Sequence, residues 1–373
     1  MTSPNELFYR IALTKIPEIG SIICKNLIAY CGSAEAVFTS SKSKLKKTPL
    51  IGEVRAEKIF NSIQQKETFE AAETEIAFIE KHQIQPLFFT DKGYPQRLLH
   101  CEDGPAMLYY KGNSNLNSEK TISIVGTRNA TEYGKETTSK IISELANSGI
   151  LILSGLAYGI DSMAHQAAVE NNISTVGVLA HGLNKIYPEK NKNLAKQMVL
   201  NGGLLTEYTT QCNFHPGNFP ERNRIVAGMS DAVLVVESDI KGGAVITANI
   251  ASSYNRDVFA VPGKVSDKYS RGCNFLIKTY KATLVESSAD LLYAMNWEVK
   301  EKAANAKPKQ LQLVISGNEK TIYDLLLSGE KTVDTLLAES HLKAGELSAT
   351  LLEMEMNDWL ISLPGKRYKL RQA

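Results

Sequence analysis

The chain has 373 residues, of which 43% are hydrophobic, and a formal net charge of +2 at pH 7. This length allows two or three domains with a sizeable core, and the near-neutral charge excludes a uniformly basic surface, so any nucleic-acid site must be local. The five cysteines form no CxxC motif and no stretch of about 18 apolar residues occurs, so we expect reduced thiols in a soluble, cytoplasmic protein outside membranes.

In the first region, residues 1–75, the spacing of apolar residues is typical of short helices only. Apolar residues recur at helical intervals in LFYRIALTKI, SIICKNLIAYCG and AEKIFNSI. The segments IPEIG (16–20) and PLIG (49–52) read as the turns between them. We therefore expect a small all-helical domain at this end of the chain.

The second region, residues 76–298, alternates strands with helices. Edge strands and loops are expected before residue 121, and seven short apolar runs follow at 121–126, 151–155, 174–180, 203–208, 232–238, 257–263 and 282–287. Runs rich in Val, Ile and Leu are typical of strands that are buried on both faces. Their alternation with helices predicts an α/β fold with a doubly wound parallel sheet.

The last part of the chain contains a predicted linker and a small domain. Residues 299–314 are charged, rich in Ala and Lys, and include Pro308, which is typical of a solvated linker. Residues 315–373 contain three helical patterns and then LISLPGKRYKL (360–370), which fits a hairpin. Three helices followed by a hairpin predict a winged helix.

Small and basic residues follow the carboxyl ends of the predicted parallel strands, where ligands bind in open sheets. They are Gly126-Thr127-Arg128, Ser154-Gly155 with Gly159, His181-Gly182, Lys241-Gly242-Gly243 and Gly263-Lys264. Glycine lets a ligand approach the backbone, and arginine binds phosphate in a bidentate manner, so this rim suits a chain of phosphates. Two separate alternatives stay open. One is that Gly159, Gly182 and Gly263 form tight turns only. The other is that Arg128 makes a surface ion pair.

The segment FHPGNFPERNR (214–224) combines an aromatic residue with closely spaced cations. Phe219 follows a turn at 216–218, and Arg222 and Arg224 lie within one helical turn of each other. Single-stranded nucleic acid is bound by this mixture, with cations for the backbone and an aromatic face for a base. The alternative is that Phe219 packs in the core and one arginine pairs with Glu207 or Glu221.

Motifs of common enzyme classes are absent from the sequence. The first strand is followed by GTRNATEYG rather than GxGxxG, which argues against a dinucleotide enzyme. Asp161 and His165 share a helix face, but Ser154 lies in no GxSxG motif, which favours a structural role for this pair. The six histidines lack metal-ligand spacing. We therefore expect no catalytic residue, no cofactor and no metal.

Several segments, in order along residues 85–290, give the chain a family resemblance. IVGTR, SGLAYGIDSMAH, YPEKNKNLA, GNFPERNRIVAGMSDAVLVVES, GGAVITA, VFAVPG and RGCNFLI resemble the signature segments of the DprA (Smf) DNA-processing proteins. The resemblance implies an extended Rossmann domain that binds single-stranded DNA, and a homodimer. It also implies loading of a RecA-type recombinase on incoming DNA in natural transformation, without enzymatic activity.

The resemblance assigns site residues by position. The phosphate pocket would use Arg128, Ser154, Gly155, Arg222, Asn223, Lys241, Gly242 and Gly243, and the loop that contacts a base would be Gly217, Asn218 and Phe219. Two departures stand out: Gly242-Gly243-Ala244 replaces the family's Ser-Gly-Ser and removes two hydroxyl donors, and Asn184 replaces an Asp. With Arg224 and Lys264 from the strand-end and helix patterns, these residues form the predicted site.

The remaining expectations concern the two flanking domains and an alternative function. Residues 1–75 resemble paired helix-hairpin-helix units, for which phosphate binding and a packing role both stay open. The third helix of the winged helix carries Glu346, Glu353, Glu355 and Asp358, which repel phosphate, so we expect a protein-contact module unless Lys366, Arg367 and Lys369 dominate. The alternative function is a nucleotide-processing enzyme of the lysine-decarboxylase-like phosphoribohydrolase group, but KGGAVITAN (241–249) lacks that group's carboxylate.

Overall fold

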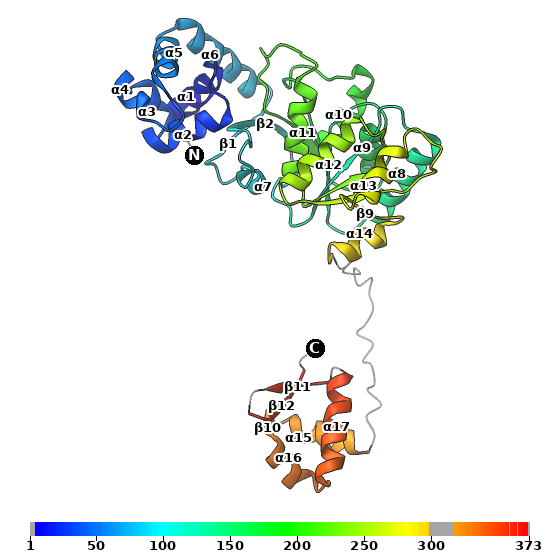
Figure 1. The fold of residues 1–373 in the computed structure, drawn as a ribbon. Helices are drawn as coiled ribbons and strands as arrows, with labels where there is room; N and C mark the ends of the chain where they lie inside the picture. The colour runs from blue at the N-terminus through cyan, green and yellow to red at the C-terminus, as the bar shows by residue number, and fades with distance from the viewer. Residues whose placement is uncertain (1–3, 298–316, 358, 364, 372–373) are drawn as a thin grey trace. The chain divides into compact units, whose positions relative to one another are not determined.

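The computed structural model describes residues 4–297, 317–357, 359–363 and 365–371 (Figure 1). The chain divides into two compact units, Met1–Lys300 and Glu301–Ala373. The predicted linker, 299–314, lies outside the described residues. Within the described parts, no helix is both long and apolar enough to span a membrane.

The N-terminal part of the first unit is helical, as predicted. Its helices are α1 (Pro4–Lys15), α2 (Ser21–Cys31), α3 (Ala34–Phe38), α4 (Lys42–Lys46), α5 (Glu53–Ile63) and α6 (Lys66–Lys81). The turns before α2 and α5 have matching backbones: Glu18 and Leu50 have positive φ, and Gly20 and Gly52 are extended N-caps. The expected domain boundary at residue 75 falls inside α6.

The rest of the first unit is built on one nine-stranded sheet with the order β1-β2-β6-β5-β4-β3-β7-β8-β9. Its strands are β1 (Gln85–Phe88), β2 (Met107–Gly112), β3 (Thr121–Val125), β4 (Leu151–Ser154), β5 (Thr175–Val178), β6 (Gly202–Thr206), β7 (Ala232–Val235), β8 (Asp257–Ala260) and β9 (Thr283–Leu284). Strands β3–β9 are parallel, and β1 and β2 are antiparallel additions at one edge. The doubly wound parallel sheet is therefore confirmed.

Helices cover both faces of this sheet. One face carries α8 (Glu132–Glu144), α9 (Ile160–Glu170), α10 (Lys192–Leu200) and α14 (Ser288–Ala294), and the other carries α7 (Gln96–Leu99), α11 (Asn218–Gly228), α12 (Gly243–Ser253) and α13 (Arg271–Lys278). A short 3-10 helix, Glu189–Asn191, precedes α10. Strand β3 shows the alternation that this arrangement requires, because Ile122 and Ile124 pack on one face and Val125 on the other.

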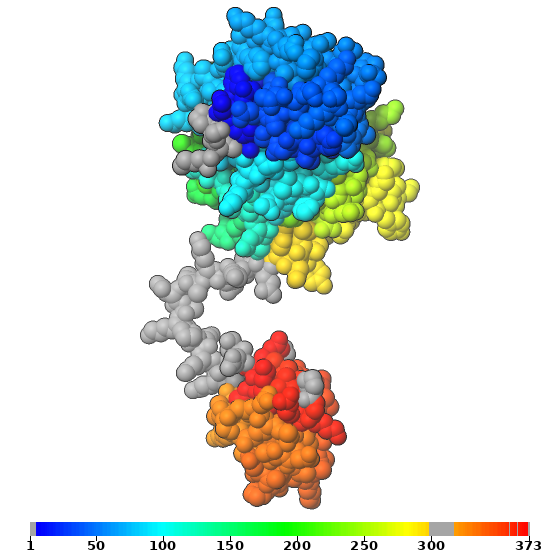
Figure 2. Space-filling view, turned by 90° about the vertical axis from the view of Figure 1, so that its left-hand side faces the viewer, coloured from blue at the N-terminus to red at the C-terminus, as the bar shows by residue number. Residues whose placement is uncertain are grey.

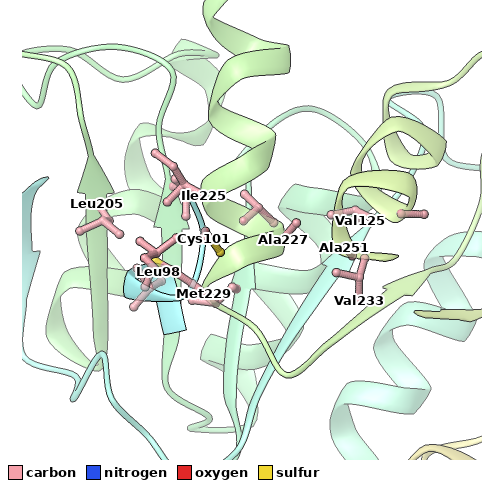
Figure 3. Close-up of a cluster of buried hydrophobic side chains, with 14 of the residues drawn as sticks. Leu98, Cys101, Val125, Leu205, Ile225, Ala227, Met229, Val233 and Ala251 are labelled. Atoms are coloured by element: carbon pink, nitrogen blue, oxygen red, sulfur yellow. The ribbon is translucent and has the colours of Figure 1, made fainter. Parts of the chain in front are cut away.

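Helix α11 is fixed to the sheet by its C-terminal half. Ile225, Ala227 and Met229 are buried among side chains such as Leu205 of β6 and Val125 of β3 (Figure 3). Burial of each large apolar side chain contributes roughly 1.5–3 kcal/mol. This packing sets the position of the N-terminal end of α11, which carries the arginines singled out in the sequence.

The N-terminal helices share a hydrophobic core with the antiparallel edge of the sheet. Ile11 and Ile16 belong to the same cluster as Phe88, Met107 and Tyr109, and Figure 2 shows the helical part packed directly on the sheet part. The helical region and the sheet therefore form one continuous unit.

Polar contacts also connect the N-terminal helices to the loop between β6 and α11. The buried Glu75 of α6 accepts hydrogen bonds from the backbone N–H of Thr210 (2.9 Å) and from its hydroxyl (2.6 Å). Lys15 of α1 donates to the Thr209 hydroxyl (2.5 Å). The N-terminal helices thus hold one end of the loop that leads to Phe219.

The second unit has the predicted winged-helix elements. It contains α15 (Asn318–Leu326), α16 (Val333–Ser340) and α17 (Ala344–Met356), and the hairpin of β11 (Leu360–Leu363) and β12 (Arg367–Leu370). A two-residue strand that the sequence did not indicate, β10 (Lys331–Thr332), pairs with β12. Of the acidic residues expected on the third helix, Asp358 lies outside the described residues, and Glu346 and Glu353 are exposed.

Candidate nucleic-acid interface

A cavity of about 530 Å³ opens at the carboxyl ends of β3 and β7. The sheet order reverses between these two strands, since β4–β6 lie on one side and β8–β9 on the other. Such a switch point leaves a crevice between the loops, which is where open α/β sheets bind ligands. The cavity brings together seven residues of the predicted site: Arg128, Phe219, Arg222, Asn223, Lys241, Gly242 and Gly243.

The loop that follows β3 is held in place by a buried carboxylate of the neighbouring strand end. Glu237, which is only 3% exposed, accepts hydrogen bonds from the backbone N–H (2.9 Å) and the hydroxyl (2.5 Å) of Thr131. The Thr127 N–H donates to the Glu237 carbonyl at 2.7 Å. Gly159, with φ of 77°, lies so close to the Thr127 carbonyl that an added Cβ would collide with it. The loop therefore presents Arg128 from a fixed backbone.

Arg222 lies at the bottom of the cavity and is 3% exposed. Its Nη1 donates to the carbonyl of Val178 at the end of β5, while its Nε has no hydrogen-bond partner among the described residues. A Cβ on Gly155 would lie under 3.0 Å from three atoms of the guanidinium. The glycine after β4 thus provides the space that Arg222 occupies, rather than a turn alone.

Burial and a nearby carboxylate have opposite effects on the Arg222 charge. Burial lowers the pKa of Arg222, and the charge of Asp161 opposes this shift. Burial also raises the pKa of Asp161, and the Arg222 charge and the N–H groups of Gly155 and Ala157 (3.2 and 3.4 Å) counteract it. A buried cation with an unused donor is stabilised by an anion that enters the cavity.

Arg128 and Phe219 form one wall of the cavity. The Arg128 guanidinium carbon lies 5.4 Å from the centroid of the half-buried Phe219 ring. No carboxylate pairs with the exposed Arg128 in the part of the chain that the structure describes. The wall therefore offers an aromatic ring beside a cation.

The opposite wall is the N-terminal end of α12. Gly242 is the extended N-cap, and the N–H groups of Gly243 and Ala244 have no acceptor within the described residues. Lys241 is exposed beside them, and Asp239 is paired with Arg271 at 3.2 Å. Backbone donors and a lysine at a helix N-terminus favour an anion, even though the hydroxyls of a Ser-Gly-Ser segment are missing.

Six other residues of the predicted site do not line this cavity. Ser154 is fully buried and donates to the Ile124 carbonyl at 2.6 Å, and Asn218 donates to the Ala180 carbonyl at 3.2 Å. Gly155 leaves the space that the Arg222 guanidinium occupies, and Gly217 is the residue before α11. Lys264 is exposed on the loop after β8, outside the lining.

Arg224 is the sixth of these residues, and it faces the core side of α11. It pairs with the largely buried Glu207 at 2.5 Å, which is the alternative that the sequence left open. Burial lowers the pKa of Arg224, but the charges of Glu207 and Asp103 and the hydrogen bond to Glu207 together outweigh this effect and raise the pKa overall. We therefore leave Arg224 out of the proposed phosphate surface.

The cavity contains residues that the sequence did not single out. Asn129, Lys268 and Tyr269 also line it, and Asn129 donates to the Tyr269 hydroxyl at 3.1 Å. Lys268 and Tyr269 lie on the loop after β8 in which Lys264 was expected to act. The sequence indicated the loop, but its fold brings a later lysine to the site.

The groups considered for catalysis are engaged elsewhere. His165 is fully buried and its Nδ1 bonds to the Thr175 hydroxyl at 2.7 Å, while burial lowers its pKa to about 3. Asn249, which ends the KGGAVITAN segment, accepts from Lys281 at 3.1 Å and does not line the cavity. Among the described residues there is no cluster of His, Cys, Asp and Glu that could hold a metal ion.

Comparison with known proteins identifies similar chains along most of the sequence. The family described as DNA recombination-mediator protein A matches residues 85–296, and the DprA winged helix domain matches residues 302–366. The protein Smf of a Synechocystis species is 32% identical over 98% of this chain and 99% of its own length.

Two solved structures are similar in fold and sequence. The X-ray structure of DNA processing protein A from Streptococcus pneumoniae has a TM-score of 0.63 and 29% identity, and covers 79% of this chain and 98% of its own. The structure of DNA processing protein A from Helicobacter pylori, described with its single-stranded DNA binding mode, has a TM-score of 0.53 and 28% identity. It covers 58% of this chain and 98% of its own.

Proposed function

The chain belongs to the DprA (Smf) family, and on that premise we propose that it is a single-stranded DNA-binding recombination mediator. The strand would enter the cavity at the ends of β3 and β7. Its phosphates would meet Arg128, Arg222 and Lys241, and a base would lie on Phe219. The relative from Helicobacter pylori, whose structure concerns single-stranded DNA binding, supports the choice of ligand.

The observation that carries this proposal is the pairing of unused donors with an aromatic ring in one cavity. Arg222, a buried cation, and the N-terminal end of α12, where the N–H groups of Gly243 and Ala244 have no acceptor within the described residues, line the same cavity. Phosphate oxygens would accept from these N–H groups, and the phosphate charge would offset that of Arg222. Phe219 is half-buried beside them, and its ring suits an unstacked base, which a duplex does not offer.

The protein would act without catalysis. We infer from the family that it loads a RecA-type recombinase on incoming DNA in natural transformation, as a cytoplasmic protein. The engagement of His165 and Ser154 in buried hydrogen bonds supports a binding role, because neither is available as a base or a nucleophile.

We also infer that the protein forms a homodimer through its sheet domain. Strand β9 lies at the edge of the sheet and is only two residues long, and both of its residues are exposed. Leu284 of this strand and the nearby Tyr280, which is 97% exposed, are apolar or aromatic side chains at this edge. An open edge flanked by apolar side chains is a surface that a second copy can cover.

The winged helix would contact protein rather than DNA. Glu346 and Glu353 are exposed on α17 together with Leu352 and Met356. Acidic and apolar side chains on one helix repel phosphate and favour a protein surface. On the wing, Arg367 pairs with Glu330 at 2.8 Å, which weakens its attraction for DNA.

The experiment that tests this function compares labelled oligo-dT with a duplex of the same length, with and without a RecA-type recombinase. We expect the single strand to bind more tightly, and recombinase loading to depend on the protein. Replacement of Arg128 and Lys241 by Ala should weaken binding without loss of melting temperature, because both side chains are exposed. Equal affinity for duplex and single strand, or release of free base from nucleoside monophosphates, would contradict the proposal.

A further inference from the structure

Three aromatic side chains lie together beside the main cavity. The ring of Phe219 is 5.6 Å from that of Phe214 and 5.8 Å from that of Tyr187, and Tyr187 and Phe214 are 5.0 Å apart. Tyr187 and Phe214 are 43% and 42% exposed. The rings meet at angles between 59° and 85°, so no two of them are stacked in parallel.

A second cavity of about 650 Å³ is lined by two of these rings, those of Tyr187 and Phe214. Its lining includes Tyr187, Phe214, Lys185, Lys192 and a single acidic residue, Glu189. The Lys185 ammonium lies 4.9 Å from the Phe214 ring centroid. Neither lysine has an ion-pair partner in the described ranges of the chain, so the cavity has a net positive charge beside an aromatic surface.

A third, small cavity shares lining residues with both. It is lined by Arg128 and Phe219, which also line the main cavity, and by Tyr187, which also lines the second one. A ligand that leaves the main cavity past Phe219 therefore meets Tyr187 and Phe214 next. Aromatic faces alternate with the cations Arg128 and Lys185 along this line.

We propose that the second cavity is a further subsite for single-stranded DNA, which receives the nucleotides that follow those in the main cavity. Bases would pack on Phe214 and Tyr187, and phosphates would lie near Lys185 and Lys192. This inference rests on the proposed function of the main cavity. The alternation of cations and aromatic rings fits a nucleic-acid strand, because each nucleotide brings one phosphate and one base face.

Oligonucleotides of different length distinguish binding at this subsite from binding in the main cavity. We would measure the affinity of the full chain for oligo-dT of increasing length by fluorescence anisotropy. Affinity should rise with length until both cavities are filled. Phe214→Ala, and separately the double variant Lys185→Ala/Lys192→Ala, should weaken binding of the long oligonucleotides by about five-fold or more, from the loss of one stacked base or of two cations.

The same variants should bind the shortest oligonucleotides as the unchanged protein does, since those fill only the main cavity. Tyr293→Ala is the matched control, because Tyr293 is 90% exposed on α14 and lines neither cavity. Melting temperatures should change little, because both lysines are exposed and Phe214 is 42% exposed.

Three results would overturn the inference while leaving the proposed function in place. They are unchanged affinity of the variants for every length, equal loss for short and long oligonucleotides, and unchanged DNA binding with a lost contact to a recombinase. If the unchanged protein bound no oligo-dT at any length, the proposed function itself would fail.

Discussion

Substitution of Gly155 by Ala tests how the main cavity holds its buried arginine. Gly155 would make no contact with DNA, but an added Cβ would lie under 3.0 Å from three guanidinium atoms of Arg222, where ordinary contact begins at 3.4 Å. The guanidinium would have to move by more than a few tenths of an ångström. It would lose its bond to the Val178 carbonyl and its place in the cavity.

The expected magnitude follows from the cost of overpacking and of one charge-assisted bond. Overpacking of a buried site typically costs about 1–3 kcal/mol, and a hydrogen bond to a charged group contributes about 1.5–3 kcal/mol. We therefore expect Gly155→Ala to lower the free energy of unfolding by about 1–3 kcal/mol and the affinity for oligo-dT by at least about ten-fold. Chemical denaturation and fluorescence anisotropy measure the two effects.

A double-variant cycle shows whether Arg222 transmits this effect. In an Arg222→Gln background the shorter side chain leaves room, so Gly155→Ala should change affinity little further, and the two effects should not add. Gly345→Ala is the control, since Gly345 lies on α17, lines neither cavity, and a Cβ there meets no atom within 4 Å. Full additivity, or an unchanged affinity of Gly155→Ala, would refute the explanation.

Three further predictions follow from individual buried contacts. His165 has a pKa of about 3 when folded against 6.5 ordinarily, so its contribution to stability is complete above pH 6.5. That contribution is lost as the pH falls towards 3, by up to about 1.4 kcal/mol per pH unit. His165→Gln should therefore flatten this part of the stability–pH curve. Glu75→Ala should lower the melting temperature and also weaken oligo-dT binding, because it releases the loop that leads to Phe219, and an unchanged affinity would show that the loop needs no such support. Arg224→Ala should lower the melting temperature but leave the salt dependence of DNA binding unchanged, because its guanidinium pairs with Glu207 rather than lining the cavity.

The periodicity of the sequence predicted the sheet and its helices because strands buried on both faces leave continuous apolar runs. The runs at 121–126 and 232–238 correspond to β3 and β7, whose ends frame the cavity. By contrast, β10 and β9 are two residues long and are set by pairing with a neighbour. Such short strands carry little pattern of their own, so β10 was not predicted.

The site was predicted less completely than the fold, because side-chain direction depends on tertiary packing. Arg222 and Arg224 are two positions apart on α11 and therefore point different ways, one into the cavity and one towards Glu207. The sequence showed only that both were cations near a sheet edge. Lys268 was missed for the same reason, since the fold of its loop brings it to the cavity in place of Lys264.

The salt dependence of single-strand binding tests the central claim most directly. For single strands, log affinity falls with log salt, and the slope becomes shallower by about 0.7 for each phosphate contact that is lost. The double variant Arg128→Ala/Lys241→Ala should therefore bind oligo-dT more weakly and with a slope shallower by about 1.4 than the unchanged protein. A slope and an affinity equal to those of the unchanged protein would mean that the strand does not bind in this cavity.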